Sequence, residues 1–124
     1  MGGSHWAKVA RITGGDPLTL LAESRQTMIW SEGIDAPEKG QPFGDKGRQE
    51  LGRLVFGKTV KIETKGKDRY GRTLGRVYVG ETDVNVHLVH QGFAWWYRKY
   101  SDDPKFKTAA DAARRDRRGL WADP

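Results

Sequence analysis

The sequence predicts an α+β chain that is mainly β, with five strands and three helices. Between residues 6 and 34, β-branched and large apolar residues occur in short runs separated by turn residues, which predicts three strands. Residues 60–63 and 76–79 alternate between apolar and polar, as half-buried strands do. Segments 45–57, 83–92 and 103–119 carry apolar residues at helical spacing. The predicted order is three strands, a helix, two strands and two helices.

Turn residues separate the predicted strands. Gly14-Gly15-Asp16-Pro17 and Glu23-Ser24-Arg25-Gln26 are typical of hairpin turns, and the third strand is expected to run to Ile34. Residues 65–72 form a further predicted turn between the fourth and fifth strands. The strands are therefore expected to pair mainly with their neighbours along the chain.

Capping residues set the predicted ends of the helices. Gly57 and Gly92 are placed to end the first two helices, and Asp83 is placed to cap the start of the second. Asp103-Pro104 is a favourable start for the third helix, which Gly119 is expected to end. The buried faces of the first and third helices are predicted to carry Leu51, Leu54, Val55, Phe106, Ala109, Ala110 and Ala113.

Length and composition indicate one folded domain. The chain has 124 residues, of which 36% are hydrophobic, including five tryptophans, so it can bury a core and is not a disordered chain. Met1–His5 is typical of a cloning remnant, and residues 6–124 are expected to form a single domain.

Charge favours a polyanionic partner. Lysine and arginine total 22 against 16 acidic residues, for a net charge of +6, which favours nucleic acid over a membrane, although a solvated basic surface is an equal alternative. The absence of cysteine excludes disulfides, cysteine-zinc sites and thiol nucleophiles. No apolar run approaches the roughly 20 residues that span a bilayer.

Five short motifs occur in a distinctive order. They are Gly15-Asp16, Gly33-Ile34-Asp35-Ala36-Pro37-Glu38, Asp68-Arg69-Tyr70-Gly71-Arg72, Gln91-Gly92-Phe93-Ala94 and Arg118-Gly119-Leu120-Trp121. Together they resemble the staphylococcal (micrococcal) nuclease family, and the resemblance extends from Lys8 to Trp121. It implies that family's fold, a five-stranded β-barrel of the OB type with three α-helices.

The resemblance also implies a site for phosphodiester hydrolysis. Asp16, Asp35 and the backbone carbonyl of Ala36 match the family's ligands for Ca²⁺, a cation that prefers oxygen. Glu38 matches the glutamate that orients or activates water, and Arg72 matches a catalytic arginine that stabilises charge on the phosphate. Without the family pattern, these aspartates would be interpreted as turn residues.

Trp30 departs from the family pattern at a catalytic position. The family places an arginine five residues before the aspartate that Asp35 matches, whereas this chain has Ile29-Trp30-Ser31. Indole cannot supply a charged donor, and the loss of one such donor costs about 10²- to 10³-fold in rate. Gly14 and Pro17 also depart from the family's first hairpin. Reduced or absent activity is therefore expected.

Aromatic and basic residues alternate where nucleic acid is expected to bind. The resemblance makes Arg69, Tyr70, Tyr97 and Tyr100 substrate-binding candidates, because stacking rings beside cations suit single strands. Trp95 and Trp96 are alternatively packing residues. His87 and His90 are three residues apart on a helix and could bind a metal, but a structural role is favoured.

Three hypotheses follow. The first is a Ca²⁺-dependent nuclease that hydrolyses DNA and RNA and prefers unpaired or frayed strands. It is expected to be a monomer that does not bind a membrane, and its activity is expected to be impaired by Trp30. The second is a non-catalytic binding module of OB type that recognises nucleic acid or another partner through the altered barrel face. The third is a barrel face reshaped for stability alone.

The departures from the family pattern cluster around one face of the barrel. This clustering indicates an engineered variant, with natural drift as the alternative, and the resemblance implies a secreted or periplasmic parent.

Overall fold

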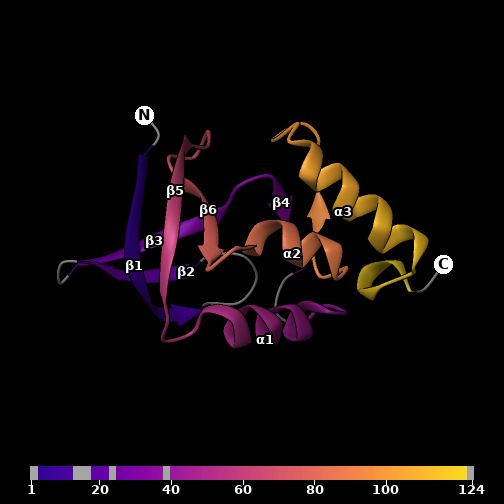
Figure 1. Ribbon diagram of the computed structural model, residues 1–124, viewed down its shortest axis with the longest axis horizontal. Coiled ribbons are helices and arrows are strands. Elements are labelled where there is room, and N and C mark those ends of the chain that lie inside the picture. Colours follow the sequence, from indigo (N-terminus) through magenta and orange to yellow (C-terminus); the bar gives the residue numbers. More distant parts are fainter. Residues whose placement is uncertain (1–2, 13–17, 23–24, 38–39, 123–124) are drawn as a thin grey trace.

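The computed structural model describes residues 3–12, 18–22, 25–37 and 40–122 (Figure 1). The first hairpin, residues 13–17, lies outside the described residues, as do residues 23–24 of the second. No described helix has the length and apolar character needed to cross a membrane. In chain order the elements are β1 (Gly3–Ile12), β2 (Leu18–Ala22), β3 (Arg25–Ser31), β4 (Ile34–Asp35), α1 (Gly44–Val55), β5 (Thr59–Lys67), β6 (Thr73–Val79), β7 (Thr82–Asp83), α2 (Val84–His90), β8 (Trp95–Trp96), α3 (Pro104–Arg115) and the 3₁₀ helix η1 (Gly119–Trp121).

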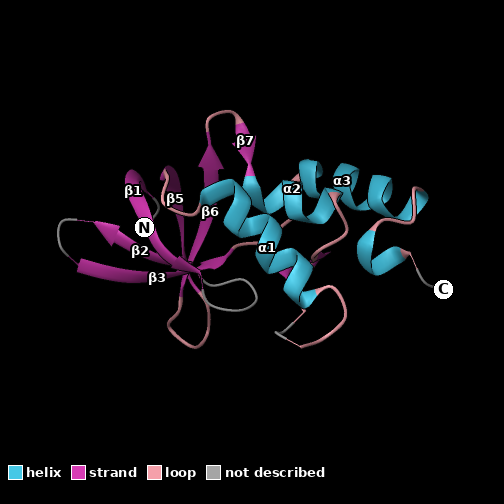
Figure 2. Ribbon diagram, turned by 90° about the horizontal axis from the view of Figure 1, so that it is seen from below, coloured by secondary structure: helices cyan, strands magenta, loops and turns pink. Residues whose placement is uncertain are grey.

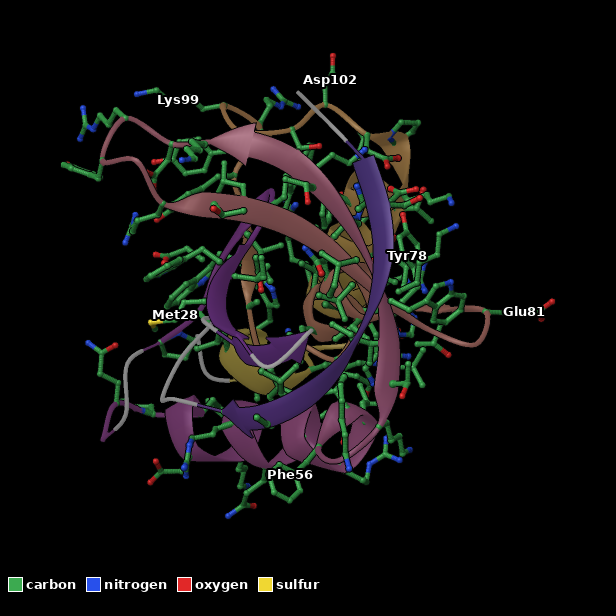
Figure 3. All side chains as sticks on the ribbon, turned by 90° about the vertical axis from the view of Figure 1, so that its left-hand side faces the viewer. Met28, Phe56, Tyr78, Glu81, Lys99 and Asp102 are labelled. Carbon is green, nitrogen blue, oxygen red and sulfur yellow. The ribbon has the colours of Figure 1, made fainter. Side chains whose placement is uncertain are left out.

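The main sheet curls into an OB-like barrel. Its strand order is β3-β2-β1-β5-β6-β7, with antiparallel neighbours, and the other edge of β3 pairs in parallel with β6. This parallel pairing joins Trp30 to Leu74 and Ser31 to Gly75 in register. Seen end-on, the strands curve around the interior, while Met28 and Phe56 lie outside it (Figure 3). The α+β class and the OB-type barrel predicted from the sequence are confirmed.

The hydrophobic core fills the barrel and continues beneath the helices. Val9, Val60 and Ile62 from the barrel strands are at most 1% exposed. The apolar faces of α1 and α3 join the same cluster through residues that include Leu51 and Phe106. Helices α2 and α3 lie together beside the barrel, and α1 crosses at its base (Figures 1 and 2). This packing fixes the elements that carry the site.

Glycines end the first two helices as predicted. Gly57 follows α1 with φ 73°, and Gly92 follows α2 with φ 79°, a left-handed conformation that suits glycine. Gly92 also touches the C-terminal segment, because a Cβ atom at this position would lie 2.2 Å from the carbonyl oxygen of Arg118. The cap at the start of α2 is confirmed too, since the side chain of Asp83 accepts a hydrogen bond from the backbone N–H of Val86.

The predicted end of the third helix was wrong. Helix α3 ends at Arg115 rather than at Gly119, because Arg117 takes a left-handed conformation with φ 52°. The N–H groups of Arg117 and Arg118 then bond back to the carbonyls of Arg114 and Ala113, which closes a Schellman motif. Gly119 instead begins η1.

Three strand boundaries also differ from the prediction. Strand β3 stops at Ser31 rather than Ile34, because Gly33 turns the chain with φ 83° and starts the separate strand β4. Strand β5 continues to Lys67, into the predicted turn, with a register shift at the left-handed Gly66. Strand β1 begins at Gly3, so the β1–β5 ladder extends into the segment expected to be a remnant.

Glu50 joins helix α1 to helix α2. Its carboxylate accepts two hydrogen bonds from the Arg53 guanidinium, at 2.9 and 2.8 Å, and lies 2.6 Å from Nε2 of His87. The hydrogen bond from Arg53 outweighs burial, and with the help of His87 it lowers the pKa of Glu50 from 4.5 to about 2. Its ionised form therefore stabilises the folded chain.

Replacing Glu50 should weaken the fold in a pH-dependent way. A lowered carboxylate pKa adds stability above the unfolded pKa, and this stability is lost as pH falls from about 4.5 to about 2. Because Arg53 is exposed, we expect Glu50→Gln to cost about 1–2 kcal/mol at pH 7 and almost nothing at pH 2. Urea unfolding at several pH values measures this, with the exposed Glu81→Gln as control. A loss of stability in Glu50→Gln that is the same at pH 7 and pH 2 would contradict this role of the Glu50 carboxylate.

Candidate active site

Eight of the ten predicted site residues lie within the part of the chain that the structure describes. Asp16 and Glu38 lie outside it. These eight residues form two groups. The segment from Trp30 to Asp35 runs from one group to the other. One group is Asp35, Ala36, Tyr97 and Tyr100, and the other is Trp30, Arg69, Tyr70 and Arg72.

The first group forms where strands β4 and β8 pair. Asp35 lies opposite Trp95 in this two-stranded sheet, and the N–H of Tyr97 donates to the carbonyl of Gly33. The hydroxyl of Tyr97 therefore reaches the Asp35 carboxylate, with 3.3 Å between the oxygens. The negative charge of Asp35 raises the pKa of Tyr97. Tyr100 packs edge-on against Tyr97, with ring centroids 5.4 Å apart, so a half-buried carboxylate lies beside two exposed tyrosines.

The second group forms where strand β3 runs parallel to strand β6. Trp30 lies in register with Leu74, two residues after Arg72, which brings the indole to the turn that precedes β6. The Arg72 guanidinium lies over the Trp30 ring and over the Tyr70 ring, 5.3 Å from each centroid. Arg69 lies 5.0 Å from the centroid of the same tyrosine ring. The resemblance implies a second catalytic arginine at position 30. The indole of Trp30 takes that place and contacts Arg72, which matches the other catalytic arginine.

A buried ionic cluster supports the segment that leads to Asp35. Arg76 on β6 is 4% exposed, and its guanidinium makes ion pairs with Glu32, Asp83 and Asp103 at 3.2, 2.9 and 2.9 Å. Its Cζ atom also lies 4.4 Å from the ring centroid of Phe106. Sequence reasoning missed this cluster, because its members lie on four separate elements or turns and each is an ordinary charged residue by itself.

The acidic partners of Arg76 have second roles in the backbone. Asp83 and Asp103 are the N-caps of α2 and α3, and Glu32 lies directly before Gly33. The hydrogen bond from the Lys105 N–H, together with Arg76, lowers the pKa of Asp103. Burial alone would lower the pKa of Arg76, but its bonds to Asp83 and Asp103 outweigh burial and raise it. One guanidinium thus holds two helix starts and the approach to β4 in place.

Asn85 adds a second buried polar tie to the same segment. Its side-chain amide donates to the carbonyls of Glu32 and Gly75, and its Oδ1 accepts from the N–H of Val77. Asn85 is 1% exposed, so these bonds satisfy an amide that would be costly to bury alone. Sequence reasoning missed this residue as well, although an asparagine within the apolar run of α2 is a usable signal.

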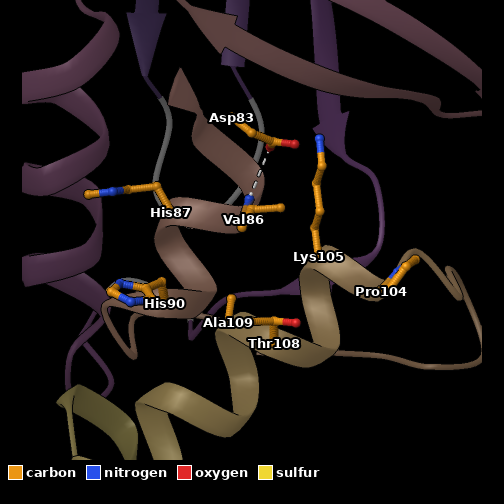
Figure 4. A pocket seen from close by; sticks show the side chains of 8 residues that line it. All are labelled: Asp83, Val86, His87, His90, Pro104, Lys105, Thr108 and Ala109. Carbon is orange, nitrogen blue, oxygen red and sulfur yellow. Dashed lines mark hydrogen bonds between the residues drawn. The ribbon is translucent and has the colours of Figure 1, made fainter. Parts of the chain in front are cut away.

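A separate hollow lies between α2 and α3, and none of the eight described site candidates lines it. Its lining residues are Asp83, Val86, His87, His90, Pro104, Lys105, Thr108 and Ala109 (Figure 4). Its two histidines have partners elsewhere, since His87 contacts Glu50 and the Arg118 guanidinium lies 3.0 Å from the His90 ring nitrogens. Burial and the charge of Arg118 lower the pKa of His90. The described site candidates therefore remain the two groups around Asp35 and Arg72, which do not line this hollow.

Within the described part of the chain, no three His, Asp or Glu side chains gather closely enough to hold a metal ion. Of the three predicted calcium ligands, Asp35 and Ala36 are described. Asp35 and Ala36 are both partly exposed residues, and a carboxylate next to a backbone carbonyl supplies the oxygen donors that Ca²⁺ or Mg²⁺ prefers. Asp35 and Ala36 thus offer oxygen donors of the kind that a hard cation prefers, while the described residues by themselves form no metal site.

The fold and these residues define an OB-like barrel protein with two polar and aromatic groups, one at β4 and β8 and one at the turn before β6. The chain belongs to the staphylococcal nuclease family, because the family model described as staphylococcal nuclease homologue matches residues 26–123. The resemblance inferred from the five motifs is therefore confirmed. Nucleases of this family generally depend on a metal ion.

Several curated relatives carry nuclease names. A Haemophilus influenzae protein named as an endonuclease is 44% identical over 117 residues, which cover 94% of this chain and 66% of the relative. A micrococcal nuclease of Shigella flexneri is 41% identical over 128 residues, covering 94% of this chain and 74% of the relative. The chain thus spans about two thirds to three quarters of the length of these relatives.

Proposed function

We propose that this chain is a metal-dependent nuclease that uses Ca²⁺ to hydrolyse phosphodiester bonds of DNA and RNA, with a rate reduced by Trp30. The observation that carries the proposal is the placement of Asp35. Asp35 belongs to the motif that resembles the family's active-site strand end, and it lies where β4 pairs with β8. Its carboxylate is 3.3 Å from the phenol oxygen of Tyr97. The family match over residues 26–123 and the nuclease names of the relatives support the activity.

The chain's own residues divide the work of hydrolysis. Asp35 and the carbonyl of Ala36 would hold the cation together with Asp16, and Glu38 would orient the attacking water. A bound Ca²⁺ would polarise the phosphate and offset its charge. Arg72 would donate to a phosphate oxygen as charge develops in the transition state. Its side chain is 45% exposed, which leaves it accessible to a substrate.

The exposed aromatic residues favour an unpaired strand as substrate. Tyr70, Tyr97 and Tyr100 are 68%, 41% and 60% exposed. Tyr97 contacts Asp35, and Tyr100 packs against Tyr97. Such rings stack on bases that duplex pairing would hide. Arg69 beside Tyr70 adds a cation for the backbone phosphates. We infer that single-stranded or frayed ends are cut in preference to closed duplex.

One observation favours a second candidate function. The indole of Trp30 is engaged with Arg72, and the Arg72 Nε atom lies 2.6 Å from Asp68. If substrate does not release these contacts, the same surface would bind a strand without cutting it. The chain would then act as a binding module of the OB type.

Cleavage of a single-stranded oligonucleotide and of a closed hairpin of equal length tests the proposal. We expect slow cutting of the single strand in Ca²⁺, slower cutting of the hairpin, and none in chelator. Asp35→Asn removes a ligand charge that Ca²⁺ needs and should lower the rate at least about 10²-fold.

Binding of the same oligonucleotide by fluorescence anisotropy separates the two candidates. Binding without cutting in any metal would support the binding module and contradict the nuclease proposal. Cutting that persists in chelator, or that Asp35→Asn leaves unchanged, would contradict the assignment of Asp35 as a metal ligand.

A further inference from the structure

Positive charge is concentrated on helix α3 and the turn that follows it. Residues 104–118 contain six lysines and arginines against two aspartates, so this segment holds four of the six net positive charges of the chain. The apolar face of α3 packs into the core through residues that include Phe106 and Ala113, which leaves the charged residues on the solvent face. Such an excess of positive charge on one surface attracts a polyanion.

The arginines of this segment differ in how they are held. Arg118 contacts α2, because its guanidinium donates to the carbonyl of His90 at 3.1 Å and to Asp116 at 2.9 Å. The side chains of Arg114 and Arg115 are instead 60% and 72% exposed, and their ion pairs with neighbouring aspartates are of the solvent-exposed kind that contributes little. Arg118 therefore has a structural role, whereas Arg114 and Arg115 can exchange an aspartate for a phosphate.

Arg117 occupies a backbone position that favours glycine. Its φ of 52° lies in the left-handed region, where a Cβ atom is disfavoured, and its side chain is exposed. Its backbone N–H donates to the carbonyl of Arg114 at 3.2 Å, a bond that glycine could make at a lower conformational cost. An unfavourable conformation that is kept with a charged, exposed side chain points to a function of that side chain.

The surroundings of these arginines favour nucleic acid over a membrane or a protein. Among the residues that the structure describes, no exposed large apolar side chain lies on the segment 104–121. Insertion into a lipid interface and the anchoring of a protein partner both use such side chains, whereas phosphate contacts need exposed cations alone. The chemistry of this surface is therefore that of a phosphate contact.

Helix α3 connects these arginines to the candidate active site. Phe106, in its first turn, packs against Gly33, since a Cβ atom added there would lie 2.5 Å from the phenylalanine ring. Gly33 precedes Asp35 by two residues. From this contact the helix runs away from the barrel over about 18 Å (Figure 1). A strand that reaches from Asp35 to Arg115 would span up to about five nucleotides, at the 3.4 Å spacing of stacked bases.

We propose that Arg114, Arg115 and Arg117 form a second contact for nucleic acid, which binds backbone phosphates of a strand whose other part lies at Asp35. The second contact does not read base sequence, because guanidinium groups on phosphates do not touch base edges. It raises the affinity for long strands. That the bound strand is a substrate rests on the proposed nuclease function, whereas binding is measurable in chelator, without cutting.

Fluorescence anisotropy in chelator tests the second contact with an oligonucleotide of about 16 nucleotides, the upper site size of an OB fold. Each lost phosphate contact lowers the salt slope for a single strand by about 0.7. We expect Arg114→Gln/Arg117→Gln to lower the slope by about 0.7–1.4 and to weaken binding about 5- to 25-fold at about 0.1 M salt. The matched control, Lys8→Gln/Lys58→Gln, removes two exposed charges from the barrel side and should change both values less.

Three results would overturn the second contact. The first is unchanged binding by the arginine double variant. The second is an equal loss in the lysine double variant, because general charge attraction would then suffice. The third is a loss of binding to vesicles of anionic lipid without a loss of oligonucleotide binding, which would assign the arginines to a membrane surface.

Arg117→Gly separates binding from folding. Relief of the left-handed conformation should leave the urea midpoint equal or higher, while the affinity for the oligonucleotide falls about 5-fold for one lost phosphate contact. A purely structural arginine would give a lower midpoint and an unchanged affinity, and this result would overturn the role of Arg117.

Cutting and binding are read out independently. If no protein cuts in Ca²⁺ but the arginine double variant loses affinity as expected, the nuclease proposal fails while the second contact stands. If the unaltered chain cuts in Ca²⁺ and the arginine double variant binds the oligonucleotide as tightly as the unaltered chain, the nuclease proposal stands and the second contact is rejected.

Discussion

Replacing Arg76 with alanine should lower the free energy of unfolding by about 3–5 kcal/mol, because it leaves the largely buried carboxylates of Glu32 and Asp83, and the more exposed one of Asp103, without their cation. Glu32, Asp83 and Asp103 are brought together by this one guanidinium, whose side chain is 4% exposed. Two of these carboxylates cap α2 and α3, so their repulsion would disturb both helix starts.

Denaturant unfolding followed by tryptophan fluorescence measures this effect. Arg76→Lys is the matched variant, because it keeps the charge but loses the planar fork that reaches several carboxylates at once. We expect it to be weakened less than Arg76→Ala and to stay folded, so the comparison remains possible even if the alanine variant does not fold. A loss below about 1 kcal/mol in Arg76→Ala would contradict the structural role given to the cluster.

Local signals explain why much of the fold was predictable. Gly57 and Gly92 end helices because left-handed backbone is easiest for glycine, and Asp83 and Asp103 cap helices through short-range hydrogen bonds. The end of α3 was missed because an arginine, Arg117, takes the left-handed position where glycine is the usual signal.

The candidate site was predictable only in part. The motifs name Asp35 and Arg72 as candidates, but no local pattern shows that Trp30 contacts Arg72, since that contact depends on the parallel register of β3 and β6. The short strands β4 and β8 were missed because two residues are too few for a visible alternation. The Arg76 cluster depends on tertiary packing of residues from positions 32 to 103.

Replacing Trp30 with arginine should raise the cleavage rate by roughly 3- to 500-fold. A restored charged donor for the phosphate in the transition state is worth about 10²- to 10³-fold, and the lost indole contact of about 0.5–2 kcal/mol takes back about 2- to 30-fold of it. In the protein without substrate, the introduced guanidinium and that of Arg72 would repel each other. The variant should therefore be slightly less stable alone and gain stability when a polyanion binds.

The matched comparison is Trp30→Lys, which restores charge without a planar fork. We expect Trp30→Lys to recover only part of the rate, because a lysine ammonium cannot bind two phosphate oxygens in parallel. Initial rates at saturating oligonucleotide in Ca²⁺ measure both variants. Equal recovery by lysine and arginine would show that charge alone matters at this position.

The most direct test of the account compares calcium-dependent cleavage by the unaltered chain, by Trp30→Arg, and by the double variant Trp30→Arg/Asp35→Asn, each in Ca²⁺ and in chelator. We expect slow cutting by the unaltered chain, fast cutting by Trp30→Arg and almost none by the double variant, with no cutting in chelator. Fast cutting by the double variant, or a failure of Trp30→Arg to cut in Ca²⁺ although folded, would contradict a nuclease site at Asp35 and Arg72.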